Sequence, residues 1–307
     1  MTTRQHASSL TPPSPIMPPS ASVHSTPCND VNAGWIAELK LGFIDRGDKT
    51  VLKHRSQKGP LSIQRPLYPE KNICHVYLLH PPGGVVGGDS LTIDVQVKSG
   101  AHTLITTPGA TKFYRSDNKL AKQTQTLVVE DGATLEWLPQ ENIFFPDSHA
   151  KVNTHVYLTD KSRFMGWEMH CFGRPALNEG FDIGAITGRT EVFINQQRVL
   201  TEQIKLIGED KLFSINGLRD SSMTASFFIT NTDDELFELV QSLLNAIQGR
   251  EKYAGLILGI THIEGLIIIR ALGEWSETIL AAFSEIWQQV RQVWLGSAAE
   301  LPRIWAT

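Results

Sequence analysis

The stretches "SGAHTLITT" (99–107) and "DGATLEWLP" (131–139) follow one plan, in which a Gly-Ala pair leads directly into an apolar, strand-like run. Their glycines, Gly100 and Gly132, are 32 residues apart. Two copies do not define a repeat family, but a turn that returns at a fixed spacing is typical of strands stacked in successive coils. We therefore expect short strands that stack turn upon turn.

Polar and apolar residues alternate along most of the first two thirds of the chain. The segment "WIAELKLGFIDRGDKTVL" (35–52) alternates and turns at 46–48, which predicts a β-hairpin. The segment "LTIDVQV" (91–97) places its apolar residues on one face with a period of two. The alternation continues to about residue 210, and we find no helical pattern before residue 230. The sequence therefore predicts a mainly β protein.

Two helical patterns come late in the chain. The first covers 233–248, where Thr232 and Glu235 have the spacing of a capping box. The second covers 277–295. Both carry an apolar stripe at helical spacing, and an apolar hairpin lies between them. We expect a long array of strands followed by two helices.

The composition of the 307 residues is that of an ordinary globular protein, with 41% hydrophobic and 20% charged residues. A net charge of −4 gives no general attraction for nucleic acid or acidic lipid, and no apolar run reaches the roughly 18–20 residues of a membrane helix. Three cysteines without a C-x-x-C pair favour a reducing, cytoplasmic compartment. Residues 1–32 are rich in Pro and Ser and predict a disordered tail, which leaves 33–307 as a single domain.

The loop "HPPGGVVGGDSL" (80–91) holds two prolines and four glycines. A Walker-type phosphate loop needs Lys and then Ser or Thr after its last glycine, followed by a helix. Here Asp89 follows Gly88 and a strand comes next, which argues against a nucleotide site and favours a turn that needs glycine for its backbone. A turn alone does not explain His80 and Asp89 at the two ends of the loop, since imidazole and carboxylate are both metal ligands.

A second unusual loop, "TTPGATKFYRS" (106–116), carries Thr111, Lys112, Tyr114 and Arg115. It lacks the nucleophile elbow of a hydrolase and the glycine spacing of a phosphate loop. Its basic and aromatic side chains suit contact with an acidic or aromatic surface of a partner, although a solvated loop would have the same composition. We predict partner contact for these four residues.

The segment "RFMGWEMHCFGRP" (163–175) has the pattern of a strand in which Glu168 and His170 share one face. If that face points inward, water, a partner charge or a metal must accompany Glu168, because a bare carboxylate in a dry core costs several kcal/mol. If it points outward, the carboxylate is simply solvated. Glu136, in "TLEWLP", and Thr111 are weaker candidates for an interior position of the same kind.

Four segments, "RPLYPEKNICHVYLLHPPGGVVGGDSLTIDV", "LITTPGATKFYRS", "LEWLPQENIFFP" and the terminal "LPRIWAT", resemble the urease accessory protein family UreD, called UreH in some systems. They occur in the family's order and span about residues 35–307. The resemblance implies a large, mostly β, helix-like stack of strands with two α-helices. It also implies a non-catalytic role in a hetero-oligomer with UreF, the GTPase UreG and the urease apoprotein, in which nickel is installed in urease.

The resemblance gives the candidate acids and histidines a role in nickel transfer. A transfer path should offer few ligands at each position, because a closed set of ligands would retain the ion. We therefore expect no tightly bound cofactor and only transient Ni²⁺. The predicted path residues are Asp89, Glu168, His80 and His170. The alternative is a purely structural scaffold that never contacts nickel.

The terminal segment "LPRIWAT" (301–307) contains Arg303 and Trp305. Arg and Trp are residue types favoured at the energetic centres of interfaces, so we predict partner contact here as well. Anchoring of the chain end within the fold would use the same two residues, and both roles stay open at this point.

Overall fold

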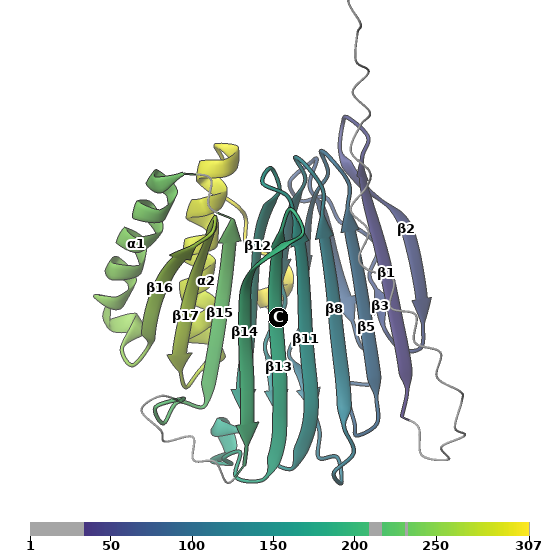
Figure 1. Ribbon diagram of the computed structural model, residues 1–307, viewed down its shortest axis with the longest axis vertical. Coiled ribbons are helices and arrows are strands. Elements are labelled where there is room, and N and C mark those ends of the chain that lie inside the picture. The colour runs from purple at the N-terminus through teal and green to yellow at the C-terminus, as the bar shows by residue number, and fades with distance from the viewer. Residues whose placement is uncertain (1–33, 209–216, 231–232, 307) are drawn as a thin grey trace, which may run out of the picture. The chain divides into compact units, whose positions relative to one another are not determined.

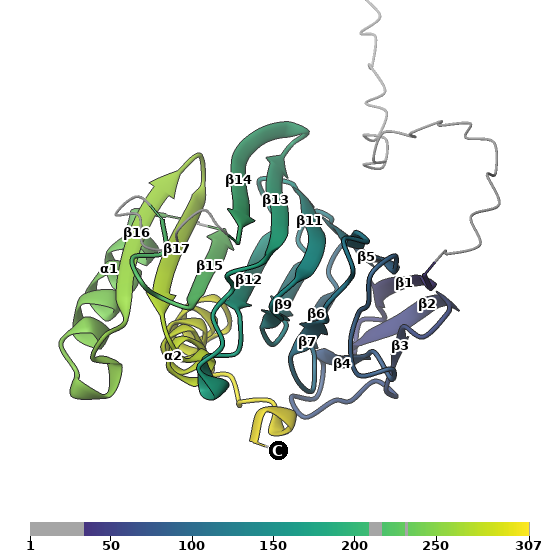
Figure 2. The ribbon, with the colours of Figure 1, turned by 90° about the horizontal axis from the view of Figure 1, so that it is seen from below.

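The computed structural model describes residues 34–208, 217–230 and 233–306, and about half of these residues lie in strands. The strands form two sheets that face each other, with helices on the outer side of one sheet (Figures 1 and 2). The predicted mainly β fold, a stack of strands with two late helices, is confirmed. The tail predicted at residues 1–32 lies outside the described residues.

The first sheet has seven strands in the spatial order β14, β13, β11, β8, β5, β1 and β2. Their bounds are β1 Ile36–Asp45, β2 Thr50–Lys58, β5 Ser90–Val97, β8 Ala121–Val129, β11 Ser148–Leu158, β13 Gly184–Ile194 and β14 Gln197–Ile207. The five central strands pair in parallel, whereas β2 and β14 are antiparallel strands at the two edges.

The second sheet has the main order β16, β17, β15, β12, β9, β6, β4 and β3. Of two further short strands, β10 pairs with β12 and β7 pairs with β10. Their bounds are β3 Ser62–Ile63, β4 Cys74–Leu79, β6 His102–Thr106, β7 Thr111–Phe113, β9 Thr134–Leu138, β10 Asn142–Phe144, β12 Arg163–Phe172, β15 Met223–Thr230, β16 Ile257–Ile263 and β17 Leu266–Gly273. Strands β4, β6, β9 and β12 pair in parallel, and β15, β17 and β16 extend the sheet in antiparallel fashion.

The repeated Gly-Ala turn accounts for the stacking. Gly100 and Gly132 have φ angles of 76° and 68°, which glycine adopts without strain, and a fully buried alanine follows each of them. The two turns lie directly on one another, since the amide of Thr134 donates to the carbonyl of Ala101 at 2.8 Å. The same offset of 32 residues sets the register of β5 on β8. One coil of the stack is therefore 32 residues long at this point.

The fold has two hydrophobic cores, one between the two sheets and one between the second sheet and the helices. Strand β12 contributes to both. Phe172 belongs to the core between the sheets, whereas Trp167 belongs to the core beneath the helices. Glu168 and His170 lie on the same face as Phe172, toward the first sheet. The alternation predicted for this strand is therefore confirmed.

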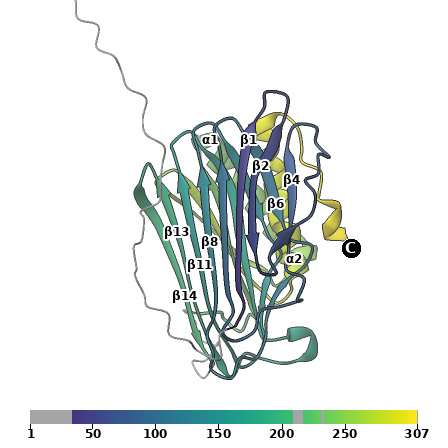
Figure 3. The same cartoon turned by 90° about the vertical axis from the view of Figure 1, so that its right-hand side faces the viewer.

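Helix α1 (Asp234–Gln248) and helix α2 (Ser276–Leu295) pack on the second sheet, and the side view shows α2 on the opposite side from β8, β11 and β13 (Figure 3). The N-cap of α1 is Asp233, whose carboxylate accepts from the amide of Leu236 at 2.9 Å. The predicted cap, Thr232, lies outside the described residues. An acid suits the position because it also offsets the positive end of the helix dipole. Three short 3₁₀ turns complete the fold: η1 Pro175–Leu177, η2 Glu251–Tyr253 and η3 Arg303–Ala306.

Candidate functional site

The space between the sheets contains two cavities. The larger, of about 680 Å³, lies between β13 and β14 on one side and β12, β15 and β17 on the other. The smaller, of about 340 Å³, lies between β5, β8 and the loops that follow β4 and β6. Glu168 lines both cavities. Of the two orientations open to this side chain from the sequence, the inward one is therefore observed.

Two hydroxyl groups of the first sheet hold the Glu168 carboxylate. Thr154 of β11 donates to Oε1, and Thr190 of β13 donates to Oε2 at 2.6 Å. The side-chain amide of Gln125 in turn donates to the Thr154 hydroxyl at 3.3 Å. These donors are neutral, so they orient the carboxylate without neutralising it. The negative charge stays available for a cation in either cavity.

His170, two residues further along β12, lines the larger cavity and is only 8% exposed. Burial lowers the pKa of its imidazole, against the opposing effect of the negative charge on Glu168. The ring is therefore neutral at physiological pH, and a neutral imidazole can bind a metal ion through a ring nitrogen. Glu168 and His170 thus form an open pair of ligand types on one face of one strand.

The two end residues of the glycine-rich loop, His80 and Asp89, lie in different surroundings. His80 lines the smaller cavity, and its Nδ1 atom is buried without a hydrogen-bond partner among the described residues. Burial lowers the pKa of this imidazole, with Asp89 opposing the shift. Asp89 lies outside the cavity lining: its Oδ1 accepts from the amide of Trp35 at 2.8 Å and its Oδ2 from the amide of Val86 at 2.9 Å. His80 therefore offers an unpartnered ring nitrogen at the smaller cavity, whereas Asp89 braces the loop; nickel contact by either residue stays a prediction.

The glycines of this loop permit close contact with the second unusual loop. A Cβ atom at Gly84 would lie 2.3 Å from Cε2 of Tyr114, which is too close for any real side chain. Beside it, the amide of Val85 donates to the carbonyl of Lys112 at 2.7 Å, and the amide of Tyr114 donates back to the carbonyl of Val85 at 2.9 Å. The two loops that the sequence analysis singled out therefore form one structural unit. These contacts support the interpretation of the glycine-rich loop as a turn that needs glycine for its backbone.

The four residues predicted for partner contact lie in this unit. Lys112 and Arg115 are exposed, and Thr111 and Tyr114 are half-buried. Thr111 and Lys112 also line the smaller cavity. Contact of these residues with a partner stays a prediction, but their exposure and their position beside the cavity are compatible with it.

Trp305 packs within the fold near the end of the chain. Its indole N–H donates to Oγ1 of Thr106 at 2.8 Å, and its ring lies 5.7 Å from that of Trp167 and 5.9 Å from that of Trp287, between ring centroids. Arg303 is exposed. Anchoring of the chain end is therefore visible in the contacts of Trp305, and partner contact by either residue stays a prediction.

A buried ionic cluster, which sequence reasoning missed, lies beneath α2. Glu136 is fully buried beside a partner charge, an interior position of the kind suggested for it, but it faces the helices and lines neither cavity. Its Oε2 accepts from Nη1 of Arg291 at 2.8 Å and from Nε1 of Trp287 at 2.6 Å, and His102 contacts Oε1. Arg291 also donates to Glu70 at 2.5 Å. The sequence signal that could have indicated this cluster is Arg291, a single arginine inside the apolar stripe of the second helix.

The charge on Glu136 is strongly favoured in this cluster. Burial alone would raise the pKa of its carboxyl group, but the charge of Arg291 and the hydrogen bonds from His102 and Trp287 hold it at about 2. The cluster fixes α2 on the second sheet, and its position on the far side of the sheet separates it from the two cavities.

The residues that the structure describes contain no group of three His, Cys, Asp or Glu side chains arranged to hold a metal ion. No helix in residues 34–208, 217–230 and 233–306 is long and apolar enough to cross a membrane. The described residues thus form a two-sheet β stack with a hydrophobic core between the sheets. Its two cavities carry metal-ligand residue types singly or in pairs.

Comparison with known proteins identifies the family. Residues 36–306 match the family model described as UreD urease accessory protein. The chain is 48% identical over 283 residues to a urease accessory protein UreD of Aliivibrio fischeri strain MJ11, which covers 91% of this chain and 99% of that protein. It is 47% identical over 276 residues to the UreD protein of Escherichia coli (90% and 98%) and 40% identical over 274 residues to that of Klebsiella aerogenes (89% and 97%).

The chain belongs to the UreD family of urease accessory proteins. The resemblance found in the sequence is thus confirmed. Membership implies a role in urease maturation, together with contacts to urease and to other accessory proteins.

Proposed function

We propose that the protein assists nickel insertion into urease as a cytoplasmic scaffold in a complex with UreF, the GTPase UreG and the urease apoprotein. It holds no tightly bound cofactor in this proposal, and Ni²⁺ is a cargo that contacts it transiently. The observation that carries the proposal is the position of Glu168, a carboxylate oriented by neutral hydroxyls and shared by both interior cavities.

The arrangement of ligand types suits transfer better than storage. Among the described residues, Glu168 is the only one common to the two cavity linings, so an ion moving from one cavity to the other would pass it. His80 offers an imidazole in the smaller cavity, and His170 offers one in the larger. Nickel binds imidazole nitrogen and carboxylate oxygen, and one or two ligands at each position favour reversible binding.

A purely structural scaffold is the second candidate. It is favoured by Asp89, whose two carboxylate oxygens are both used by backbone amides. In that case Glu168, His80 and His170 would only bind water in the cavities. The two candidates agree on complex formation and differ in what happens to nickel when the interior ligands are replaced.

The first experiment measures urease activity and bound nickel in cells that carry the urease subunits and the other accessory proteins, with and without this chain. We expect both quantities to depend on the chain. Full activity in its absence would refute a role in maturation for this protein.

The second experiment tests the interior residues in the assembled complex. We expect Glu168→Gln and His170→Ala to leave complex formation intact and to reduce the nickel bound per urease. The matched control is Glu191→Gln, which changes a buried carboxylate on the outer face of β13, where it contacts His155 and Arg198. Normal nickel loading by both interior variants would leave the structural scaffold as the better description.

A further inference from the structure

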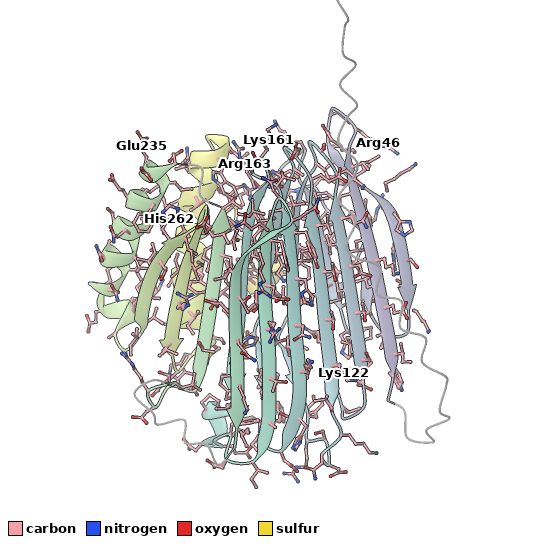
Figure 4. The ribbon with its side chains drawn as sticks, in the orientation of Figure 1. Arg46, Lys122, Lys161, Arg163, Glu235 and His262 are labelled. Atoms are coloured by element: carbon pink, nitrogen blue, oxygen red, sulfur yellow. The ribbon has the colours of Figure 1, made fainter. Side chains whose placement is uncertain are left out.

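The end of the fold that carries the glycine-rich loop exposes several large apolar side chains. Val86 is 48% exposed, Leu120 41%, Leu177 59% and Ile183 64%. In Figure 4 this is the end at which Lys122 is labelled. Apolar side chains gathered at one exposed place usually mark a site of contact with another protein.

These residues belong to one continuous surface, because hydrogen bonds join their loops in series. The carbonyl of Val85, beside Val86, accepts from the amide of Tyr114. The amide of Ser116 donates to the carbonyl of Asp147 at 3.1 Å, and the amide of Asp147 donates to the carbonyl of Ile183 at 2.7 Å. The surface, called here the loop-end surface, is formed by Val86, Tyr114, Leu120, Phe145, Arg174 and Ile183.

An aromatic and cationic cluster lies at the centre of the loop-end surface. The rings of Tyr114 and Phe145 meet edge to face with centroids 4.9 Å apart, and the guanidinium of Arg174 lies 4.8 Å from the Phe145 centroid. Two hydrogen bonds of 2.6 Å to Glu179 hold that guanidinium in place. Beside the cluster is a hollow of about 350 Å³, lined in part by Phe145, Arg174 and Ile183. Preordered Tyr and Arg side chains beside a hollow are typical of interface hot spots.

The segment 111–122 at the rim of the loop-end surface is basic, whereas Glu179 and Asp182 are among the residues that line the hollow. Residues 111–122 contain four cationic side chains and a single acid, Asp117. The four cations are all exposed and are Lys112, Arg115, Lys119 and Lys122. Among the described residues, the one ion pair that any of them forms joins Arg115 to Asp147 at 3.8 Å. On a protein with a net charge of −4, this local excess of positive charge suits an acidic partner.

Strand β2 is a useful comparison, because it carries a similar charge in a different setting. Its Lys53, Arg55 and Lys58 are exposed at the edge of the first sheet, where charge protects an edge strand from unwanted pairing. None of the exposed large apolar side chains found in the described residues lies on β2. Positive charge around an apolar, aromatic centre therefore distinguishes the loop-end surface from a basic strand.

We propose that the loop-end surface docks an acidic patch of the urease apoprotein, which inserts an apolar side chain into the hollow. The inference rests on the proposed function, because Thr111 and Lys112 belong both to this basic segment and to the lining of the smaller cavity. A partner docked here adjoins the cavity, so that cargo leaving it meets the partner rather than bulk solvent.

The test measures binding of the full-length protein, in its complex with UreF, to nickel-free urease apoprotein. Two variants probe the surface: Lys119→Glu/Lys122→Glu reverses the rim charge, and Ile183→Glu places an acid beside the hollow. Two controls match them elsewhere: Lys53→Glu/Arg55→Glu on β2, and Val293→Glu at a 51% exposed valine of α2. We expect each surface variant to weaken binding about tenfold or more, each control to stay within about twofold of the wild type, and added salt to weaken wild-type binding more than that of the charge-reversed variant.

Three results would overturn the assignment: surface variants that bind within about twofold of the wild type, controls that lose as much affinity as the surface variants, or no binding by the wild-type protein. The assay contains no nickel, so its outcome is separate from the maturation test. Urease that matures without the chain would refute the proposed function, whereas normal binding by the surface variants would refute only this docking surface.

Discussion

Arg291 of α2 donates to Glu136 of β9 at 2.8 Å, and neither side chain is exposed to solvent. The same guanidinium reaches Glu70, in the segment before β4, at 2.5 Å. One arginine therefore ties the last helix to two separate parts of the chain. Removing one partner of such a pair leaves the other charge buried and unpaired, which is strongly destabilising.

We expect Arg291→Met to lower the free energy of unfolding by about 3–5 kcal/mol, as measured by urea denaturation. The control is Arg250→Met, which breaks a pair between Arg250 and Glu285 in which the arginine side chain is 46% exposed. Solvent screens that pair, so we expect a much smaller change than for Arg291→Met. Equal effects of the two substitutions would show that the buried cluster does not hold α2 in place.

The same cluster predicts a loss of stability in acid. The pKa of Glu136 is about 2 in the folded protein, against an ordinary value of 4.5. A carboxyl group with a depressed folded pKa contributes stability that is complete above its unfolded pKa and is lost as the pH falls toward the folded value. The contribution is about 3 kcal/mol and disappears between pH 4.5 and about 2.

The measurement compares unfolding free energies of the wild type and Glu136→Gln across this pH range. His102, Glu70 and His75 lie in or near the same cluster, so the difference between the two curves is the informative quantity. We expect the difference to shrink as the pH falls from 4.5 toward 2, because the unfolded wild type then binds a proton at Glu136 that the folded protein does not bind. Parallel curves would contradict the assignment of a strongly depressed pKa to Glu136.

The contact between the two loops predicts a requirement for glycine at one position. Gly84→Ala places a Cβ 2.3 Å from Cε2 of Tyr114 and 2.8 Å from the carbonyl oxygen of Lys112. Overpacking of this kind lowers the free energy of unfolding by about 1–3 kcal/mol. Gly109→Ala, with open space around the new methyl group, should change it by less than about 0.5 kcal/mol. Thermal or urea unfolding of the two variants checks this, and equal stabilities would refute a steric role for Gly84.

Features of the fold that depend on short, local sequence patterns could be predicted from the sequence. The alternation of polar and apolar residues along β12 predicted that Glu168 and His170 share one face. The repeated turn at Gly100 and Gly132 predicted that strands stack on one another. Both predictions succeed because each pattern lies within a short stretch of chain. The helix cap shows the limit of such reasoning. Thr232 and Asp233 are adjacent residues of cap-forming type, and the observed cap is Asp233.

Contacts between distant residues could not be predicted in the same way. Arg291 and Glu136 are 155 residues apart, and no periodicity links them. The pairing of the glycine-rich loop with residues 106–116 likewise depends on how successive coils stack. The sequence therefore predicted which residues belong to the candidate site but not how they are arranged. The structure places His80 in the lining of the smaller cavity and Asp89 outside it.

Asp89 is the residue at which a structural role and a nickel role predict different results. Asp89→Ala removes the acceptors of two backbone amides, those of Trp35 and Val86, and a buried donor left without a partner costs about 1–3 kcal/mol. We therefore expect reduced stability, less assembled complex, and normal nickel per assembled complex. Glu168→Gln should show the reverse, with near-normal stability and less nickel.

Unfolding curves and metal analysis of purified complexes together separate these results. Asp89→Asn is the graded control, since its amide keeps one acceptor oxygen and should fall between the wild type and Asp89→Ala in stability. If Asp89→Ala unfolds like the wild type but its complexes lack nickel, Asp89 belongs to the transfer path, and its bonds to Trp35 and Val86 would then orient a ligand rather than brace a loop.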